Sequence, residues 1–262
     1  MGLNDEVEVA RRVMVLFFLV DTSGSMGGSK IGAVNHAIEE VIPEIKSISV
    51  GNADAQIKIA VMKFDNSVEW ITKNGPEDSE TFVWRSLDAN GMTHMGEACK
   101  QLDKKLSTKE NGFMREATGS YAPAIFMMSD GQPNDDFDKG LKALKENNWF
   151  KAAVKVAIAI GDDANKDVLA QFVGSPEGVI TAHDAATLKK WIKFVSVTAS
   201  KVASKSSNAK SNADGTPAPD NAKQEELQQA IAGQAAATGA IQAADGTINA
   251  LVTTTADPGD VW

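Results

Sequence analysis

Three oxygen-bearing side chains follow a long apolar run near the start of the chain. Asp21, Ser23 and Ser25 stand on alternate residues directly after residues 13–20, which read V-M-V-L-F-F-L-V. Such a run is typical of a strand that is buried on both faces of a parallel sheet. Gly24 lets the backbone turn sharply between the two serines. Carboxylate and hydroxyl oxygens at a strand end suit a small divalent cation such as Mg²⁺, which prefers hard oxygen ligands and keeps positions for water.

A second acidic turn follows another apolar run. Residues 124–128 are uninterruptedly apolar, and Ser129, Asp130 and Gly131 come directly after them. In an open α/β sheet, ligands bind beyond the carboxyl ends of the strands. Two buried strands that both end in acidic, glycine-containing turns therefore predict a shared site at that edge.

Alternating apolar segments predict the elements that must position these turns. Strand-like and helix-like patterns follow one another, which indicates an α/β fold with a mainly parallel sheet and helices on both faces. One antiparallel pair is expected, a hairpin formed by residues 56–64 and 68–71 with its turn at Asp65 and Asn66. The expected order is strand 13–20, helix 30–47, hairpin 56–71, helix 95–106, strand 124–128, a short helix over 137–144, strand 154–160, strand 179–181 and helix 188–202.

Composition narrows the class of partner. The chain has 262 residues, 43% of them apolar, and a formal net charge of −9. This charge argues against nucleic acid or an anionic membrane as principal partner and favours a cation or a basic protein surface. Cys99 is the single cysteine, so no intramolecular disulfide forms, and the cytoplasm is the expected location. The longest apolar run is too short to span a bilayer.

The composition changes after about Ser204. Residues 205–222 read as a flexible linker and residues 224–244 as a weak Ala/Gln helix with few apolar anchors, namely Leu227, Ile231 and Ile241. A tail of this kind buries little apolar surface, so we expect it to be flexible and dispensable for folding. The alternative is a tail that folds onto a partner through Trp262. We therefore expect an N-terminal extension (1–11), one domain (12–203) and a low-complexity linker and tail (204–262).

Three motifs together resemble the von Willebrand factor A domain with its metal-ion-dependent adhesion site. They are Asp21-x-Ser23-x-Ser25 after an apolar strand, Thr93 in the loop G-M-T-H-M-G, and Ser129-Asp130-Gly131 after the second buried strand. The resemblance spans about residues 12–201. Within that superfamily, residues 93–98 and 129–133 are similar to bacterial intracellular TerY-like proteins, which are named for tellurite-resistance operons.

The resemblance implies a fold and a ligand set. The fold is Rossmann-like and three-layered, with a mainly parallel six-stranded sheet in the order 3-2-1-4-5-6 and one antiparallel edge strand. Ser23 and Ser25 would ligate Mg²⁺ directly, Thr93 directly or through water, and Asp21 and Asp130 directly or through bridging water. Mn²⁺ and Ca²⁺ are the alternative cations. Met92 departs from the pattern, since relatives often carry glycine there.

Other polar residues near these motifs are interpreted as structural. His94 is expected to be a solvent-facing loop residue, because imidazole suits Zn²⁺ better than Mg²⁺. Four further acids lie close to helix starts, where aspartate is usually a cap. These acids are Asp135, Asp136, Asp162 and Asp163.

Three classes of function remain. The first is a non-enzymatic, metal-dependent protein-binding module in which a partner's carboxylate completes the coordination of the cation. The second is an enzyme of the haloacid-dehalogenase type, but Ser23 stands where that chemistry needs its acidic general acid. The third is a structural domain with an unused site. The resemblance favours the first and implies a protein kinase and a 2C-type protein phosphatase as partners in a stress-response or defence system.

Overall fold

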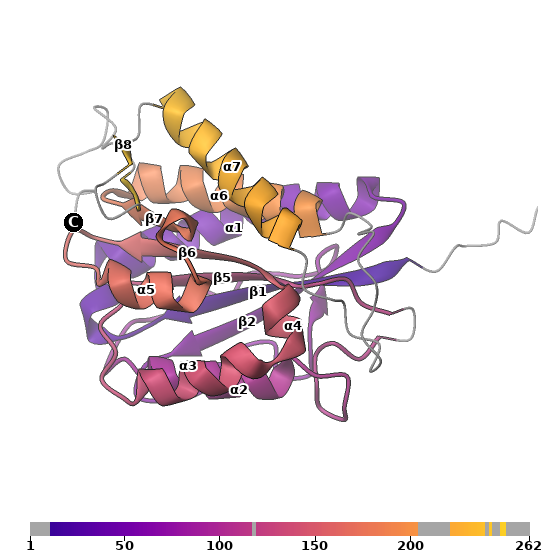
Figure 1. The fold of residues 1–262 in the computed structure, drawn as a ribbon, viewed down its shortest axis with the longest axis horizontal. Helices are drawn as coiled ribbons and strands as arrows, with labels where there is room; N and C mark the ends of the chain where they lie inside the picture. The colour runs from indigo at the N-terminus through magenta and orange to yellow at the C-terminus, as the bar shows by residue number, and fades with distance from the viewer. Residues whose placement is uncertain (1–10, 117–118, 204–220, 239–240, 243–246, 250–262) are drawn as a thin grey trace, which may run out of the picture.

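The computed structural model describes residues 11–116, 119–203, 221–238, 241–242 and 247–249. In these residues a central sheet lies between two layers of helices (Figure 1). This arrangement confirms the predicted α/β class with helices on both faces. One layer holds α1 (Ser29–Gly51), α6 (Ala185–Ala203) and α7 (Asn221–Thr238), and the other holds α2 (Met95–Lys105), α3 (Phe137–Glu146), α4 (Asn148–Ala152) and α5 (Lys166–Val173).

The sheet has the predicted strand order. Strand β1 is central and pairs in parallel with β2 on one side and with β5 on the other. The order β3-β2-β1-β5-β6-β7 equals 3-2-1-4-5-6, and β3 is antiparallel to β2 as expected. The strands of this core are β1 (Arg12–Asp21), β2 (Ala55–Phe64), β3 (Val68–Trp70), β5 (Ala124–Ser129), β6 (Val154–Ile160) and β7 (Val179–Ala182).

The sheet also extends beyond the six expected strands. Strand β4 (Glu77–Asp78) pairs antiparallel with β2, and β9 (Ile248–Asn249) pairs in parallel with β7. Strand β8 (Ile241–Gln242) then pairs antiparallel with β9. Each of these strands has two residues, which is too short to show a period-two pattern in the sequence.

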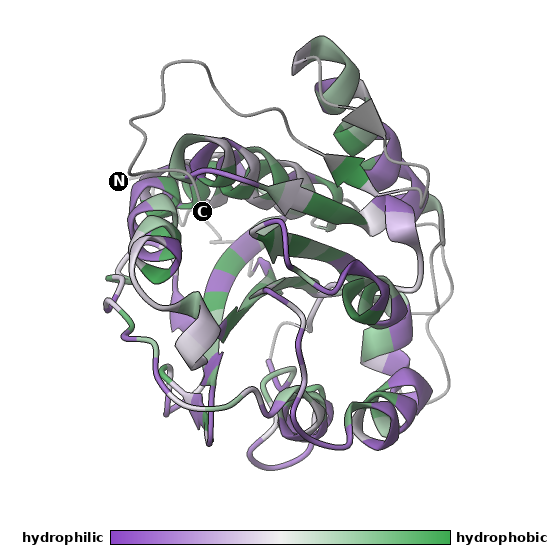
Figure 2. Ribbon diagram, turned by 90° about the vertical axis from the view of Figure 1, so that its left-hand side faces the viewer, coloured by the Kyte–Doolittle hydropathy of each residue, from purple (hydrophilic) through white to green (hydrophobic). Residues whose placement is uncertain are grey.

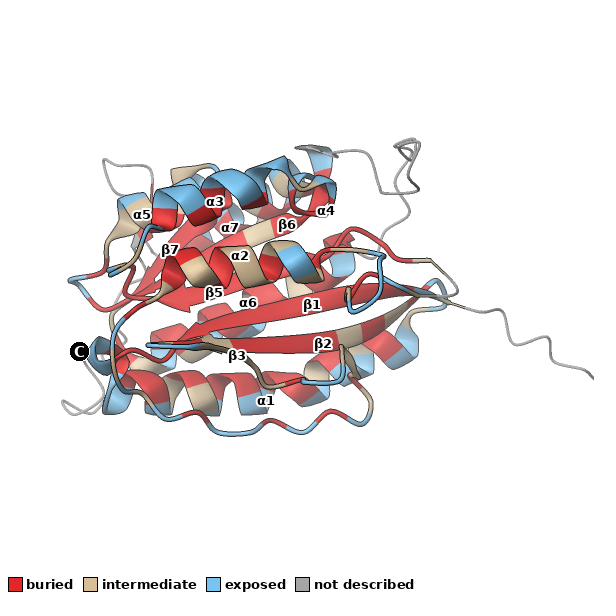
Figure 3. Cartoon of the chain, turned by 90° about the horizontal axis from the view of Figure 1, so that it is seen from below, coloured by how far each residue is buried: buried red, intermediate tan, exposed pale blue. Residues whose placement is uncertain are grey.

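Side chains of β1 fill both cores because successive residues of a strand point to opposite faces. Met14, Leu16 and Phe18 lie in the core under α1 and α6, whereas Val15 and Phe17 lie in the core under α2 and α3. Figure 3 shows the resulting pattern, with buried strands and helices that are exposed only on their outer sides. Hydropathy follows the same division, since apolar residues dominate the strands (Figure 2).

The helices α1, α2, α3 and α6 fall where apolar periodicity places them. Residues Val34, Ile38 and Ile45 are buried on one face of α1, and Pro43 does not end that helix, which continues to Gly51. Cys99 is buried in α2, and burial raises the pKa of its thiol, as is typical of a packed rather than a reactive cysteine. Two one-turn helices complete the chain path, η1 (Gly24–Met26) and η2 (Pro176–Gly178).

Helix α7 lies against the domain, which differs from the expected flexible tail. Leu227 and Ile231 are fully buried in the core that α1 and α6 also contact. The Gln224 side chain accepts a hydrogen bond from the Lys155 backbone N–H at 2.8 Å and donates to its carbonyl at 3.0 Å. Helix α7 therefore packs on the domain although its average composition is only weakly apolar. Its contacts are a few buried apolar side chains and the Gln224 amide, which pairs with the Lys155 backbone as a neighbouring strand would. The predicted linker and the anchor Trp262 lie outside the described residues.

Within the described ranges, no helix combines the length and apolar character needed to cross a membrane.

The docking of α7 makes a stability prediction. Leu227→Ala should lower the free energy of unfolding by about 2–3 kcal/mol, because it removes buried methyl groups and leaves a cavity. Gln229→Ala on the exposed side of the same helix should change it little. Urea unfolding of both variants measures the difference. An unchanged transition for Leu227→Ala would mean that α7 contributes nothing to the stability of the domain.

Candidate metal centre

The two acidic turns meet at the carboxyl edge of the sheet. Asp21 is the last residue of β1, Ser129 is the last residue of the neighbouring β5, and both are buried. The Ser129 hydroxyl donates to Asp21 Oδ2 at 2.5 Å and accepts from the Gly131 backbone N–H at 2.7 Å. Ser129 therefore holds the first acidic turn against the second.

Asp21 is a buried carboxylate with a raised pKa. Its Oδ1 accepts the Ser23 backbone N–H at 2.9 Å. Burial raises the pKa of Asp21 to about 6, although hydrogen bonds from Ser129 and Ser23 lower it, and the nearby charge of Asp130 adds to the rise. A buried carboxylate next to a second acid, with little water around it, favours a cation as neighbour.

The Ser23 and Ser25 hydroxyls face each other across a one-turn helix. Their Oγ atoms are 3.1 Å apart, and the turn between them is η1. Ser23 is buried and Ser25 is exposed. The pair therefore connects the buried carboxylates to the surface and leaves one side open to an incoming ligand.

The loop that carries Thr93 lies against this turn. The Gly24 backbone N–H donates to the Gly91 carbonyl at 2.8 Å. Gly91 has a φ of 83°, and a Cβ there would lie 2.6 Å from Asn66 Nδ2, so glycine is required at that position. Met92, by contrast, is 52% exposed and has no positive φ. Methionine at this position therefore does not strain the loop.

Thr93 itself is buried and is held by Asn134. Its backbone N–H donates to Asn134 Oδ1 at 2.9 Å, and the Asn134 N–H donates to the Thr93 carbonyl at the same distance. Asn134 follows the second acidic turn, so the pair joins the Thr93 loop to the Asp130 segment. The sequence shows no signal for this role of Asn134, which depends on contact between distant segments.

Asp130 gives the clearest test of whether a cation fits. Its carboxylate is buried, and neither Oδ1 nor Oδ2 has a hydrogen-bond partner in the described part of the protein. A buried charged group without a partner is costly, so native proteins almost always pair it or place it on a metal. A divalent cation beside Asp130 and the hydroxyls of Ser23 and Ser25 would satisfy both oxygens, and this donor set fits Mg²⁺.

The acids that sequence analysis assigned to structure have other partners. Asp135 accepts the backbone N–H groups of Gly96 and Glu97 at the start of α2, both at 2.8 Å. Asp136 caps α3 by accepting from the Lys139 N–H at 3.2 Å, while Asp163 pairs with Lys30 and Asp162 with His183. His94 is the half-buried residue before α2. In the described ranges no three His, Cys, Asp or Glu residues form a metal cluster, so a cation at this edge would need the hydroxyl ligands.

Comparisons with known proteins agree with this fold. The family model for the von Willebrand factor type A domain matches residues 16–193. A von Willebrand factor type A protein from Catenulispora acidiphila has a TM-score of 0.54 at 17% identity, covering 72% of this chain and 43% of that one. The pilus adhesin SpaC from Lactobacillus rhamnosus GG, in its open conformation, has a TM-score of 0.52 at 12% identity, covering 70% and 29%.

A third structure carries a metal. Proximal thread matrix protein 1 from the mussel byssus, with a zinc-occupied MIDAS motif, has a TM-score of 0.50 at 18% identity, covering 72% of this chain and 49% of that one. This chain spans less than half the length of each of the three proteins, and at these identities the likeness shows the fold alone. The comparison with curated protein sequences finds no match.

The unpartnered carboxylate of Asp130 makes a prediction about the metal-free protein. In EDTA, Asp130→Asn should be at least as stable as the unchanged protein, and more stable by about 1–3 kcal/mol, because a buried charge without a partner is removed. Asp163→Asn, at an exposed acid of the same edge that pairs with Lys30, is the matched control and should give no gain in stability. Chemical denaturation in EDTA measures both. A clear loss of stability in Asp130→Asn would show that the charge is compensated without metal.

Proposed function

The chain belongs to the von Willebrand factor type A family, and on that premise we propose that it is a metal-dependent protein-interaction module. The observation that carries the proposal is the Asp130 carboxylate. Its two buried oxygens have no hydrogen-bond partner among the described residues, and they lie at the sheet edge where Asp21 ends β1. A bound cation would neutralise these buried carboxylates, whereas an organic substrate would not. The cation, once bound, offers positive charge and an exchangeable coordination position.

The proposed ligand set is Asp21, Ser23, Ser25, Thr93 and Asp130. Ser23 and Ser25 would hold the cation through their hydroxyls, Thr93 directly or through water, and the two aspartates directly or through bridging water. Mg²⁺ is the proposed ion because the donors are hard oxygens, with Mn²⁺ and Ca²⁺ as alternatives. The zinc in the MIDAS motif of the mussel protein supports a divalent cation without choosing among them.

Charge supports a carboxylate as the partner's contribution. The five proposed ligands carry two negative charges, those of Asp21 and Asp130. These balance the charge of a divalent ion, and no negative charge is left over to repel a further carboxylate. A water on such an ion can be displaced by a carboxylate from a partner protein. The exposed Ser25 lies on the open side of the site, where a partner would enter.

Hydrogen bonding at Asp21 favours binding over phosphotransfer. Both of its oxygens accept hydrogen bonds, from the Ser23 N–H and the Ser129 hydroxyl. A nucleophilic aspartate of the haloacid-dehalogenase type needs a free oxygen and a second acid, and Ser23 stands in the place of that acid. The proposed role for Asp21 is therefore to support the cation.

The wider setting is proposed from the motifs at residues 93–98 and 129–133. Their similarity to TerY-like proteins supports a cytoplasmic role in a bacterial stress-response or defence system, beside a protein kinase and a 2C-type protein phosphatase. The acidic composition supports protein rather than nucleic acid or membrane as partner.

Metal binding should stabilise the folded protein. Mg²⁺ at 100 times its dissociation constant should raise the free energy of unfolding by about 2.7 kcal/mol, because the folded state alone forms the site. Ser23→Ala should lose most of this gain, and Asp163→Asn should keep it. Thermal unfolding in EDTA, Mg²⁺, Mn²⁺, Ca²⁺ and Zn²⁺, with calorimetric titration, ranks the ions. An unchanged melting temperature in every ion would remove the basis for the proposal.

Partner binding should depend on chelator rather than on salt. A complex captured from the native host should dissociate in EDTA and re-form when the metal is restored, because the cation bridges the two proteins. Asp21→Ala should abolish this binding while the variant stays folded. A complex that survives EDTA but collapses in moderate salt would instead indicate recognition by long-range charge.

A further inference from the structure

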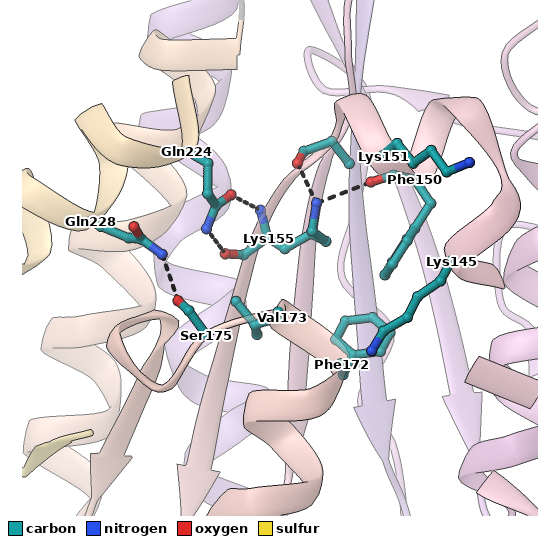
Figure 4. Close-up of a pocket in the computed structure, with 11 residues that line it drawn as sticks. Lys145, Phe150, Lys151, Lys155, Phe172, Val173, Ser175, Gln224 and Gln228 are labelled. Atoms are coloured by element: carbon teal, nitrogen blue, oxygen red, sulfur yellow. Dashed lines mark hydrogen bonds between the residues drawn. The ribbon is translucent and has the colours of Figure 1, made fainter. Parts of the chain in front are cut away.

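A pocket opens at the edge of the sheet opposite the candidate metal centre, where β6 begins. Its volume is about 290 Å³, which is close to that of small ligand sites. Side chains from both helix layers and from β6 line it (Figure 4). The lining residues on which its chemistry depends are Lys145, Phe150, Lys155, Phe172, Gln224 and Gln228.

The charge around this pocket is opposite to that of the chain as a whole. Lys145, Lys151 and Lys155 line it, and no Asp or Glu does, although the chain has 35 acidic and 26 basic residues. Lys151 pairs with Glu146 at 3.3 Å and points away from Lys155 in Figure 4. In the described ranges neither Lys145 nor Lys155 forms a salt bridge with a carboxylate. Lys145 is exposed to solvent, whereas Lys155 is partly buried and has only carbonyl oxygens and the Phe150 ring as partners.

Lys155 is poised to bind an anion. Its ammonium donates to the Phe150 carbonyl at 3.0 Å and to the Ala153 carbonyl at 2.8 Å. An ammonium group has three N–H donors, so one remains for a ligand. Burial lowers the pKa of Lys155 to about 8, which is the behaviour of an ammonium group that lacks a counter-ion. An anion beside it would stabilise the charged form.

The wall beside the lysines is apolar. The Phe150 and Phe172 rings meet edge to face, with their centroids 5.5 Å apart, and Val173 lies next to them. In Figure 4 the Lys145 side chain extends toward the Phe172 ring, so a positive group and an aromatic surface border the same space. A ligand that fits both features carries an anionic group on an apolar body.

Helix α7 closes the remaining side. Gln224 is fixed on the Lys155 backbone, and Gln228 donates to the Ser175 hydroxyl at 2.7 Å. The pocket is therefore built from side chains on both sides of the sheet edge and is held by hydrogen bonds. From its charge, its aromatic wall and its fixed amides, we propose that this pocket binds a small organic anion, namely a phosphate or carboxylate on an aromatic or alkyl group.

Binding of phenyl phosphate to the full chain tests this proposal. Calorimetric or NMR titration should show saturable binding of phenyl phosphate. Inorganic phosphate should bind more weakly because it lacks the apolar body, and benzyl alcohol should bind more weakly because it lacks the charge. Benzoate distinguishes a carboxylate from a phosphate preference. The binding should be unaffected by EDTA and by Asp21→Ala, so it stands or falls separately from the metal site.

Matched lysine variants locate the binding. Lys155→Met should weaken the binding of phenyl phosphate roughly tenfold or more, because it removes a charged donor from a partly desolvated place. Lys145→Met should weaken the binding less, because that lysine is exposed to solvent. Lys142→Met, at an exposed lysine of α3 that does not line the pocket, should leave the affinity unchanged. Melting curves show whether each variant is folded, and Lys145, being exposed, gives a variant free of core disruption. No saturable binding to the unchanged protein, or equal affinity in all three variants, would overturn the proposal.

Discussion

Burial of β1 on both of its faces is the constraint on which the rest of the molecule depends. Each of its residues after Arg12 is buried, so one strand supplies side chains to two cores and must lie at the centre of the sheet. Its last residue is Asp21, and the sheet therefore carries a carboxylate to a place that water reaches poorly. The hydrogen bonds from Ser23 and Ser129 compensate part of that charge. The remaining charge, together with that of Asp130, is what the proposed cation would neutralise.

The loops around the acids are held by close backbone contacts rather than by large side chains. A Cβ on Gly140 would lie 2.1 Å from the Gly96 carbonyl oxygen, so α2 and α3 approach at a point that only glycine allows. Asp135, just before α3, caps the start of α2 across that contact. Helix α2 begins two residues after Thr93, so these contacts also fix the position of Thr93 relative to Asp130. A residue whose backbone is held in this way loses little freedom when a ligand binds, which favours affinity.

Sequence patterns predicted the long elements because these show many repeats of one period. Strand β6 was predicted with the bounds that it has, and β1, β2, β5 and α2 within about one or two residues. The short elements α4, α5, β8 and β9 offer too few repeats, although Asn165 and Gly174 do mark the two ends of α5. Asp21, Ser23, Ser25 and Asp130 were visible because they lie at the ends of buried strands or just after them. The roles of Ser129, Asn134 and Gln224 were not visible, since each depends on a partner that is distant in the sequence.

The sheet also separates two kinds of chemistry, and α5 joins them. All five core strands from β2 to β7 run in parallel, so acidic turns gather at one edge while Lys155 stands at the other, near the start of β6. The Asn165 N–H, just before α5, donates to the Asp130 carbonyl at 2.7 Å, and Phe172 and Val173 at the end of α5 line the lysine pocket. Eight helical residues span about 12 Å, so one short rigid element contacts both sites. A ligand shifts an equilibrium only through its different affinities for the two conformations. Binding at one site therefore changes binding at the other only if the two ligands favour different positions of α5.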